Sequence, residues 1–437
     1  MFKTFRNALK VKEIRQRLIF TFLMMIVIRL GCQLPVPGVD REYFSNWFSQ
    51  QTGDSFNFID AFTGGSFLNM SVFALNITPY ITSSIIMQLL TIAIPKLEEM
   101  QKEGEDGRKK IASITRYVTV GLALIESTAM AIGFGNQGLL EKFNFLSVLT
   151  VICALTAGSA FLMWIGEQIT ESGVGNGISI VLIINIISRI PQDFTSLYGQ
   201  FMKDKSFAKA FIAGLVIAAI VLLTVVLTII LNGGERRIPV QYAKKVQGRK
   251  VLGGQSSHIP LKVNTGGVIP IIFASSLMQL PVVITQFAGG AKAGFWGHVT
   301  RALSSRNWFN KENWVYSVGA LVYIILVIFF AYFYTSITFN PMEIADNMKK
   351  QGGFVPGIRP GKPTSEYLTK ILNYIVFIGA IGLIIVAIIP IFCNGMFGAD
   401  VSFGGTSLII IVGVILETMK QVESMMLVRN YKGFLDN

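Results

Sequence analysis

The sequence contains ten apolar runs, and most of them are long enough to cross a lipid bilayer. A transmembrane α-helix needs roughly 20 mostly apolar residues. Eight runs meet this length clearly: 18–34, 117–135, 145–165, 208–231, 267–287, 314–336, 367–391 and 406–427. Two are weaker, because polar residues interrupt the run 71–94 and the run 178–190 is short. The pattern predicts an all-α polytopic membrane protein with ten spans.

Charged residues are few and lie mostly on one side of this arrangement. Only 14% of the residues are charged, against about 25% in a typical soluble domain, so the bilayer must supply part of the solvent. With ten spans both chain ends share one side, and segments on that side hold 27 of the 38 Lys and Arg residues. An excess of Lys and Arg marks cytoplasmic loops. Both termini are therefore predicted to be cytoplasmic, and both weak spans to cross.

The spans divide into two halves of five helices around a predicted central pore. The predicted segments are a cytoplasmic amphipathic N-terminus (1–17), an N-terminal half (18–200), a C-terminal half (201–427) and a cytoplasmic tail (428–437). Span two reads PYITSSIIMQLL and span seven reads PIIFASSLMQLP, so the halves faintly echo one another. Duplicated halves are common in membrane transport folds. Chance similarity between two helices with scattered polar residues is the alternative.

Two long cytoplasmic loops and one outer loop carry local signals. The loop 232–266 has Val, Ile and Tyr on both flanks with Gly and Ser between them, which predicts a protruding β-hairpin. The loop 339–366 contains FVPGIRPGKP, whose prolines and glycines predict turns. We expect both to dock a soluble partner. On the outer side, Gly64 and Gly65 would let a short helix re-enter the membrane and turn.

No catalytic or metal-binding pattern is present in the sequence. The cysteines Cys32, Cys153 and Cys393 lie in or at the end of apolar runs and have no metal-ligand spacing. The two histidines, His258 and His298, fall in predicted loops, and the GVGNG sequence lacks the Lys-Ser/Thr of a P-loop. We therefore expect no metal, no cofactor and no enzymatic activity, so the energy for any work comes from a partner.

Three ionisable residues fall inside predicted spans: Arg29, Glu126 and Glu417. Charge at membrane depth is costly and is usually paired or functional. Arg29 lies near the outer interface, where snorkelling of its side chain is the simpler explanation. Glu126 lies near the middle of its span, where a gate-lining role and a buried structural hydrogen bond are equally open. Three isolated groups do not make a proton relay.

Five segments, in order along the chain, resemble the SecY family, the channel-forming subunits of the bacterial Sec protein translocase. They are ITPYITSSIIMQLL in span two, ITESGVGNGISI from residue 169, GGVIPIIFASS from residue 266, ITFNPMEIADNMKKQGGFVPGIRPGKPTSEYL at 337–368, and FGGTSLIIIVGVILET from residue 403. Long matches spread over nearly the whole chain are more specific than any single short motif.

The resemblance implies an hourglass of helices whose waist is closed by a ring of apolar side chains. Matched by motif, the ring consists of Ile77, Ile81, Ile178, Leu182, Ile272 and Ile410. A narrow apolar constriction dewets and blocks ions. It also offers no fixed hydrogen-bonding partner, so an extended chain of any sequence can slide through. Ordinary helix packing is the alternative for each residue taken alone.

The resemblance further implies a plug and a lateral gate. The plug, at about 60–70, would be a short helix that blocks the outer funnel at rest, and its candidate residues are Asp60, Phe62, Gly64, Gly65, Phe67 and Leu68. Spans two and three would face spans seven and eight across the gate, with polar contacts from Thr82, Glu126 and Gln279. Many relatives have an uncharged polar residue where Glu126 stands, so an ionised Glu126 would make gating depend on pH.

The cytoplasmic loops match positions where the family binds its partners. Arg359, in PGIRPG, matches the position needed for the motor ATPase SecA, and a second contact, used by SecA or by the ribosome, would comprise Arg236, Arg237, Lys244, Lys245, Arg249 and Lys250. The resemblance also implies SecE-like and SecG-like small subunits, accessory SecDF and YidC-like proteins, and the bacterial plasma membrane. Its substrates would be unfolded secretory and membrane proteins with signal sequences, and no nucleic acid would be bound beyond ribosomal contact.

Two other classes of membrane protein fit the sequence less well. A secondary transporter of small solutes would need a charged relay in its spans, and it would have no use for the large basic loops. An intramembrane protease or lipid transferase would need catalytic pairs that the sequence lacks. Copurification with a small single-span subunit and stimulation of SecA ATPase would separate the channel from both.

Overall fold

The computed structural model describes residues 9–44, 46, 63–135, 138, 140, 143–203, 207–242, 245–247, 250–252, 256–287, 294–304, 307–309, 314–397 and 405–435. Each of the ten expected spans coincides with a helix in these ranges. The helices are α2 (Lys12–Gly31), α5 (Thr78–Ala93), α7 (Glu105–Phe134), α8 (Phe145–Ser172), α9 (Gly177–Phe201), α10 (Phe207–Gly233), α11 (Ile269–Phe287), α13 (Val318–Thr338), α15 (Lys362–Phe397) and α16 (Gly405–Leu435). The predicted all-α polytopic fold is confirmed.

The second span differs from its expected bounds. Ser71 forms a β-bridge with Pro35, residues 72–77 form turns, and α5 begins only at Thr78. Asn76 has a left-handed backbone with φ 53°, and Pro79 lies in the first turn of α5, where its missing N–H costs nothing. At the other end Pro95 starts α6 (Pro95–Lys102), and the chain bends by 105° between the two helices. Proline disfavours a helical backbone at the preceding residue, which explains the corner.

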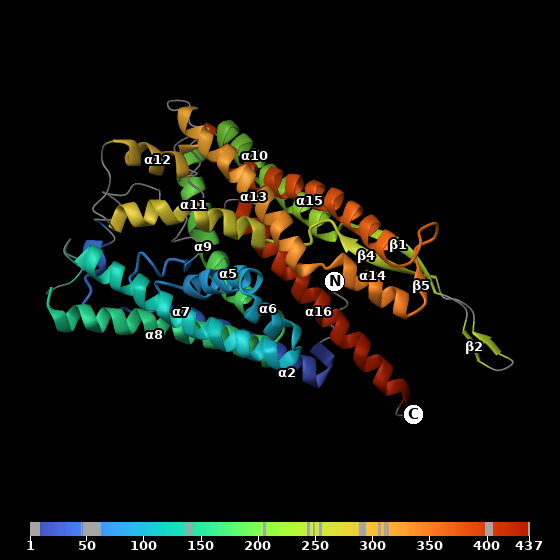
Figure 1. Cartoon of the computed structure of the whole chain (residues 1–437). Helices are drawn as coiled ribbons and strands as arrows, with labels where there is room; N and C mark the ends of the chain where they lie inside the picture. The colour runs from blue at the N-terminus through green and yellow to red at the C-terminus, as the bar shows by residue number, and fades with distance from the viewer. Residues whose placement is uncertain are drawn as a thin grey trace.

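The helices form two groups that follow the order of the chain (Figure 1). In the first group α7 packs against α5 and α8, and α8 also contacts α2 and α9. In the second, α13 packs against α11 and α15, and α15 contacts α10 and α16. The groups meet where α9 contacts α10 and α16, and where α11 contacts α7. The division into halves at 18–200 and 201–427 stays a prediction.

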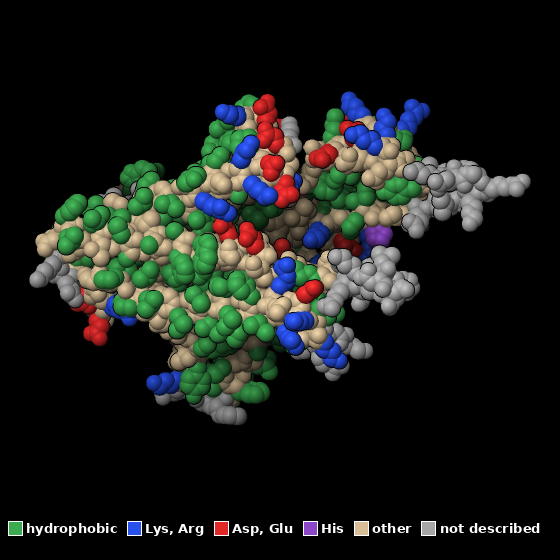
Figure 2. Space-filling model, turned by 90° about the horizontal axis from the view of Figure 1, so that it is seen from below, with side chains coloured by type: hydrophobic (Ala, Val, Ile, Leu, Met, Phe, Trp, Pro, Cys, Tyr) green, Lys and Arg blue, Asp and Glu red, His purple; other side chains and the backbone are tan. Residues whose placement is uncertain are grey.

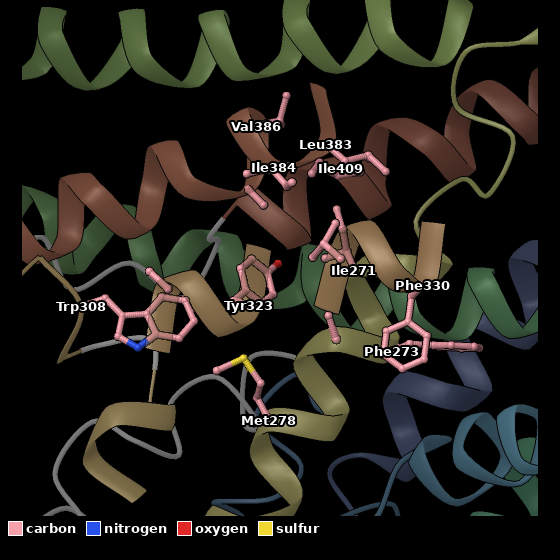
Figure 3. Packing of buried hydrophobic residues seen from close by; sticks show 14 of the residues in the cluster. Ile271, Phe273, Met278, Trp308, Tyr323, Phe330, Leu383, Ile384, Val386 and Ile409 are labelled. Atoms are coloured by element: carbon pink, nitrogen blue, oxygen red, sulfur yellow. The ribbon is translucent and has the colours of Figure 1, made fainter. Parts of the chain in front are cut away.

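A large apolar core holds the second group together (Figure 3). Phe273 of α11 meets Phe330 of α13 edge to face, with ring centroids 5.5 Å apart. Trp308 lies 5.6 Å from Tyr323 of α13, and its indole N–H donates to the Ala302 carbonyl at 2.7 Å. Ala302 belongs to α12 (Phe295–Leu303), so the connection between α11 and α13, which includes η4 (Trp314–Ser317), is tied to this core.

The predicted β-hairpin is present at one end of the bundle, which we call the hairpin end. Strand β1 (Glu235–Tyr242) pairs antiparallel with β4 (Ser256–Lys262), and the shorter β2 (Lys245–Gln247) pairs with β3 (Lys250–Leu252). Strand β5 (Gly353–Phe354) adds to the other edge of β1. The expected turns of the loop 339–366 occur from Val355 to Gly361.

Two elements of the loop 339–366 were not predicted: β5 and the helix α14 (Pro341–Lys350). The Asn340 side chain caps α14 by accepting hydrogen bonds from the backbone N–H groups of Met342 and Glu343. Asparagine followed by proline is a helix-start signal, since the amide caps the helix and proline suits its first position. Figure 2 shows Lys, Arg, Asp and Glu gathered toward the hairpin end around a hollow, while hydrophobic side chains cover much of the remaining face.

Candidate functional site

The six residues of the predicted ring come together in one apolar cluster. The six come from the residue just before α5 (Ile77), from α5 (Ile81), α9 (Ile178, Leu182), α11 (Ile272) and α16 (Ile410), and the cluster also includes side chains of α2 and α8. Ile77 has no solvent exposure and Ile410 has 1%. The cluster joins both helix groups, since α5 and α9 belong to the first and α11 and α16 to the second. That the six side chains surround a pore stays a prediction.

The start of α9 fixes two of these side chains. The Asn176 side chain accepts hydrogen bonds from the N–H groups of Ile178 and Ser179, so the helix begins at a defined residue. Ile178 and Leu182 are four residues apart and therefore share one face of α9. A Cβ at Gly177 would come 1.8 Å from the Gly166 carbonyl oxygen, so glycine is required for α9 to approach α8 this closely.

The described part of the predicted plug is a series of tight turns. Gly64 and Gly65 have φ 66° and 85°, which only glycine adopts freely, and the turns continue to Met70. The expected short helix is therefore absent from residues 64–70. Phe67 is buried and meets Phe44 at 6.0 Å, while Leu68 is half-buried against the same cluster. Asp60 and Phe62 lie outside the described residues.

Arg29 does not simply extend toward the outer interface, as snorkelling predicts. Its guanidinium Nη1 donates to the Gly64 carbonyl at 3.3 Å and to the Asn185 side-chain oxygen at 3.5 Å. The Asn185 amide in turn donates to the Asn76 side chain at 3.0 Å. Both asparagines are 1% exposed. A connected polar cluster therefore joins α2, α9, the turn before α5 and the predicted plug.

The polar contacts predicted across the lateral gate stay predictions. Thr82 and Glu126 are half-buried, and neither has a hydrogen-bond or ion-pair partner among the described residues. The side chain of Gln279 lies outside the described residues. Within the first group, Ser127 of α7 and Thr156 of α8 lie 3.0 Å apart. Across the boundary, Ile85 of α5 packs against the apolar core of the second group, and α11 contacts α7.

Basic side chains at the hairpin end are exposed. Arg236 and Arg359 are exposed and have no ion-pair or side-chain hydrogen-bond partner in the described part of the chain. Arg237 is paired with Glu235 at 2.6 Å, and this contact lowers the pKa of the Glu235 carboxyl. Lys244 and Arg249 lie outside the described residues, and only the backbone of Lys245 and Lys250 is described.

Sequence reasoning counted Asn76 only as one of the polar residues that interrupt span two, and it missed Asn185. Both are amides inside predicted spans, and a buried amide in a span must find a partner, so this signal was present. Their pairing joins residues 109 positions apart, which no local pattern reveals. Among the described residues there is no group of three or more side chains suited to holding a metal ion.

Comparison with known proteins decides the family. The SecY family model matches residues 71–419. The chain belongs to the SecY family. Protein translocase subunit SecY of Halalkalibacterium halodurans is 44% identical, that of Bacillus subtilis strain 168 is 43% identical and that of Streptomyces galbus 42%, each over 100% of both chains.

Solved structures share the SecY fold. A protein-conducting channel matches with a TM-score of 0.62 at 16% identity, and canine Sec61 from a ribosome-channel complex with 0.59 at 18%. A third match, 0.60 at 18%, is a SecY whose plug domain is described as stabilising the closed state of the translocation channel and maintaining a membrane seal. Each covers 95% of this chain and 93% of the matched chain.

Proposed function

We propose that the chain is the channel through which unfolded secretory proteins cross the bacterial plasma membrane and from which membrane segments are released sideways. The observation that carries this proposal is the apolar cluster in which all six ring residues meet from four separate elements of both halves. The membership in the SecY family supports it. The channel makes and breaks no covalent bond.

The ring would seal the resting channel and still accept any sequence. Six aliphatic side chains give a translocating chain no hydrogen-bonding partner, and a dry constriction excludes ions. The plug, about 60–70, would add a second barrier on the outer side. Opening between α5 and α7 on one side and α11 and α13 on the other would give a hydrophobic signal segment access to lipid. Thr82, Glu126 and Gln279 are the proposed polar contacts of this gate.

The hairpin end would face the cytoplasm, with both termini on that side, and would receive the energy source. Exposed Arg359 and the basic hairpin would contact the motor ATPase SecA or the ribosome, because a fixed guanidinium suits an acidic protein surface. SecE-like and SecG-like subunits would complete the complex, and SecDF and YidC-like proteins would be accessory. The positive-inside bias supports this orientation.

Site-specific crosslinking of a stalled secretory chain tests the proposal. A photoreactive residue in place of Ile81, Ile272 or Ile410 is expected to capture the stalled chain. The same residue in place of Ile125 or Ile325, which are 67% and 65% exposed on the outside of α7 and α13, serves as the matched control. Capture at the control positions alone, or solute counterflow without protein transport, would reject the channel.

A further inference from the structure

A connected polar cluster lies inside the first helix group, beside the apolar ring. It consists of the Arg29 guanidinium, the Gly64 carbonyl and the side chains of Asn185 and Asn76. Cys32 joins it, with its sulfur 3.7 Å from the Asn185 side-chain oxygen. Asn76 directly precedes the ring residue Ile77. The cluster is therefore adjacent in sequence and in space to the predicted seal.

The geometry of the cluster fits only one residue at position 64. A Cβ there would lie 2.7 Å from the Asn185 carbonyl oxygen and 2.9 Å from the Arg29 guanidinium, at a backbone φ of 66°. Both distances are too short for a real side chain. The turn at Gly64 is thus seated directly on α9 and on Arg29, with no space left between them.

The far end of segment 63–71 has its own tie to the rest of the protein, because the Val36 backbone N–H donates to the Met70 carbonyl at 3.1 Å and Pro35 forms a β-bridge with Ser71. The Ser66 hydroxyl donates to the Thr63 carbonyl at 2.6 Å and the Ser71 hydroxyl to the Ser66 carbonyl at 3.2 Å, both inside the segment. Ser66 also contacts the side chain of Cys32, which directly follows α2. Apolar packing of Phe67 and Met70 is non-directional, so the polar cluster supplies the directional contacts at the Gly64 end of the segment.

The position of Arg29 favours this role. It lies in the last turn of α2, where the carbonyl end of the helix attracts a positive charge. A hydrogen bond from a charged donor is stronger than one between neutral groups. Because the bond goes to the backbone carbonyl of Gly64, it is released whenever the turn moves, and water in an opened funnel can replace it.

We propose that Arg29, Asn185 and Asn76 form a latch that positions segment 63–71 over the ring. This inference deepens the proposed function and rests on it. Asn76 orients Asn185, Asn185 orients Arg29, and Arg29 holds the Gly64 carbonyl. These are positioning residues, because the two asparagines act on the segment through Arg29. Losing the latch shifts the channel toward a state in which the segment is displaced and the resting barrier leaks.

The first test measures ion leak through resting channels. The full chain, with the small membrane subunits that copurify with it, is reconstituted into potassium-loaded vesicles without substrate. Arg29→Leu and Asn185→Ala are each expected to raise the leak about tenfold, the effect of losing one charged hydrogen bond. Arg29→Lys should recover part of the seal. The double variant should leak no more than Arg29→Leu alone, because the residues act as one unit.

Arg41→Leu is the matched control, because Arg41 donates to the Gln33 carbonyl at 2.9 Å and does not contact the latch. It should leave the leak unchanged. Wild-type leak in monodisperse Arg29→Leu and Asn185→Ala channels would overturn the latch. If instead the wild-type channel fails to move a secretory protein, the proposed function fails, so the two failures are distinguishable.

The second test separates positioning of the segment from general damage. Cys32 contacts Ser66, so Ser66→Cys in a chain that also carries Cys153→Ser and Cys393→Ser allows a disulfide between the segment and α2. Oxidation with copper phenanthroline should abolish the leak of Arg29→Leu, and reduction should restore it. A leak that persists in the fully bridged channel would show that Arg29 acts elsewhere, and would overturn the proposal.

Discussion

The Ser83 hydroxyl of α5 lies 2.5 Å from the Thr119 hydroxyl of α7, and neither side chain is exposed to solvent. Each hydroxyl also lies within hydrogen-bond distance of a carbonyl of its own helix, those of Tyr80 and Thr115. One hydroxyl can therefore bridge the helices while the other donates to its own helix. This bond makes α5 and α7 one unit, so the proposed gate would open beside the pair rather than within it.

Removing either hydroxyl should weaken this unit by a small and measurable amount. Interhelical hydrogen bonds in membranes contribute about 0.6 kcal/mol on average, with a maximum near 1.7 kcal/mol. A double-mutant cycle of Ser83→Ala and Thr119→Val, measured by reversible unfolding in detergent, should give a coupling in that range. Thr128→Val is the control, because Thr128 is half-buried and its hydroxyl donates to the Leu124 carbonyl of its own helix. Strict additivity of Ser83→Ala and Thr119→Val would contradict the bridge.

Replacing glycine with alanine should change the free energy of unfolding in opposite directions at two positions inside the spans. A Cβ at Gly158 of α8 would lie 2.0 Å from the Val72 carbonyl oxygen, whereas a Cβ at Gly121 of α7 would meet nothing within 4 Å. Gly158→Ala should lower the free energy of unfolding by about 1–3 kcal/mol, because backbone must move. Gly121→Ala should raise it by up to about 1 kcal/mol through helix propensity. Thermal unfolding of the two variants side by side checks both signs.

The span pattern predicted the fold because hydrophobic length is a local property of the chain. Even the weak run 178–190 proved to be the start of a regular helix, α9, which continues past Pro191 to Phe201. The error in span two has a local cause as well. Its first seven residues are apolar enough to be counted, but the left-handed backbone at Asn76 keeps them in turns. Hydropathy reports burial and does not report backbone conformation.

The six residues of the predicted ring could be chosen because each belongs to a motif matched to the family, and the structure places them in one apolar cluster. The residues of the proposed latch could not be chosen together, since they come from separate segments. Arg29 was noticed for its charge, but its partner is a backbone carbonyl, which no sequence pattern marks. Long-range polar pairing is set by how helices pack, and that information is distributed over the whole chain.

The resting seal at the predicted ring should survive a change in side-chain shape but not a change from an apolar to a polar side chain. Ile410 of α16 is 1% exposed within the apolar cluster. Ile410→Leu keeps the volume and should cost less than about 1.5 kcal/mol, with no change in resting ion leak. Ile410→Asn should hydrate the constriction and raise the leak, because dewetting is what blocks ions. Conductance of single channels in planar bilayers distinguishes the two, and equal leak in both variants would argue against a dry waist.

The exposed Arg359 is expected to contribute far more to the binding of SecA than the neighbouring Lys362, which carries the same charge. Arg359 lies in the turn before α15, and its carbonyl accepts a hydrogen bond from Thr364 at 2.8 Å, which holds the turn in shape. A guanidinium on a fixed turn loses little conformational freedom when it pairs with a carboxylate. Lys362, three residues on, is 82% exposed and lies 3.9 Å from Glu366.

Arg359→Ala is therefore expected to weaken SecA binding and ATPase stimulation about tenfold or more, as for an arginine at the centre of an interface. Lys362→Ala should change them less than about threefold, because an exposed, already paired lysine contributes little. Arg359→Lys should resemble the alanine variant, since a flexible ammonium lacks the fork of donors. Titration of the reconstituted complex with SecA measures binding and ATPase stimulation for all three variants. Equal losses for Arg359→Ala and Lys362→Ala would show that SecA responds to positive charge in general and not to Arg359 specifically.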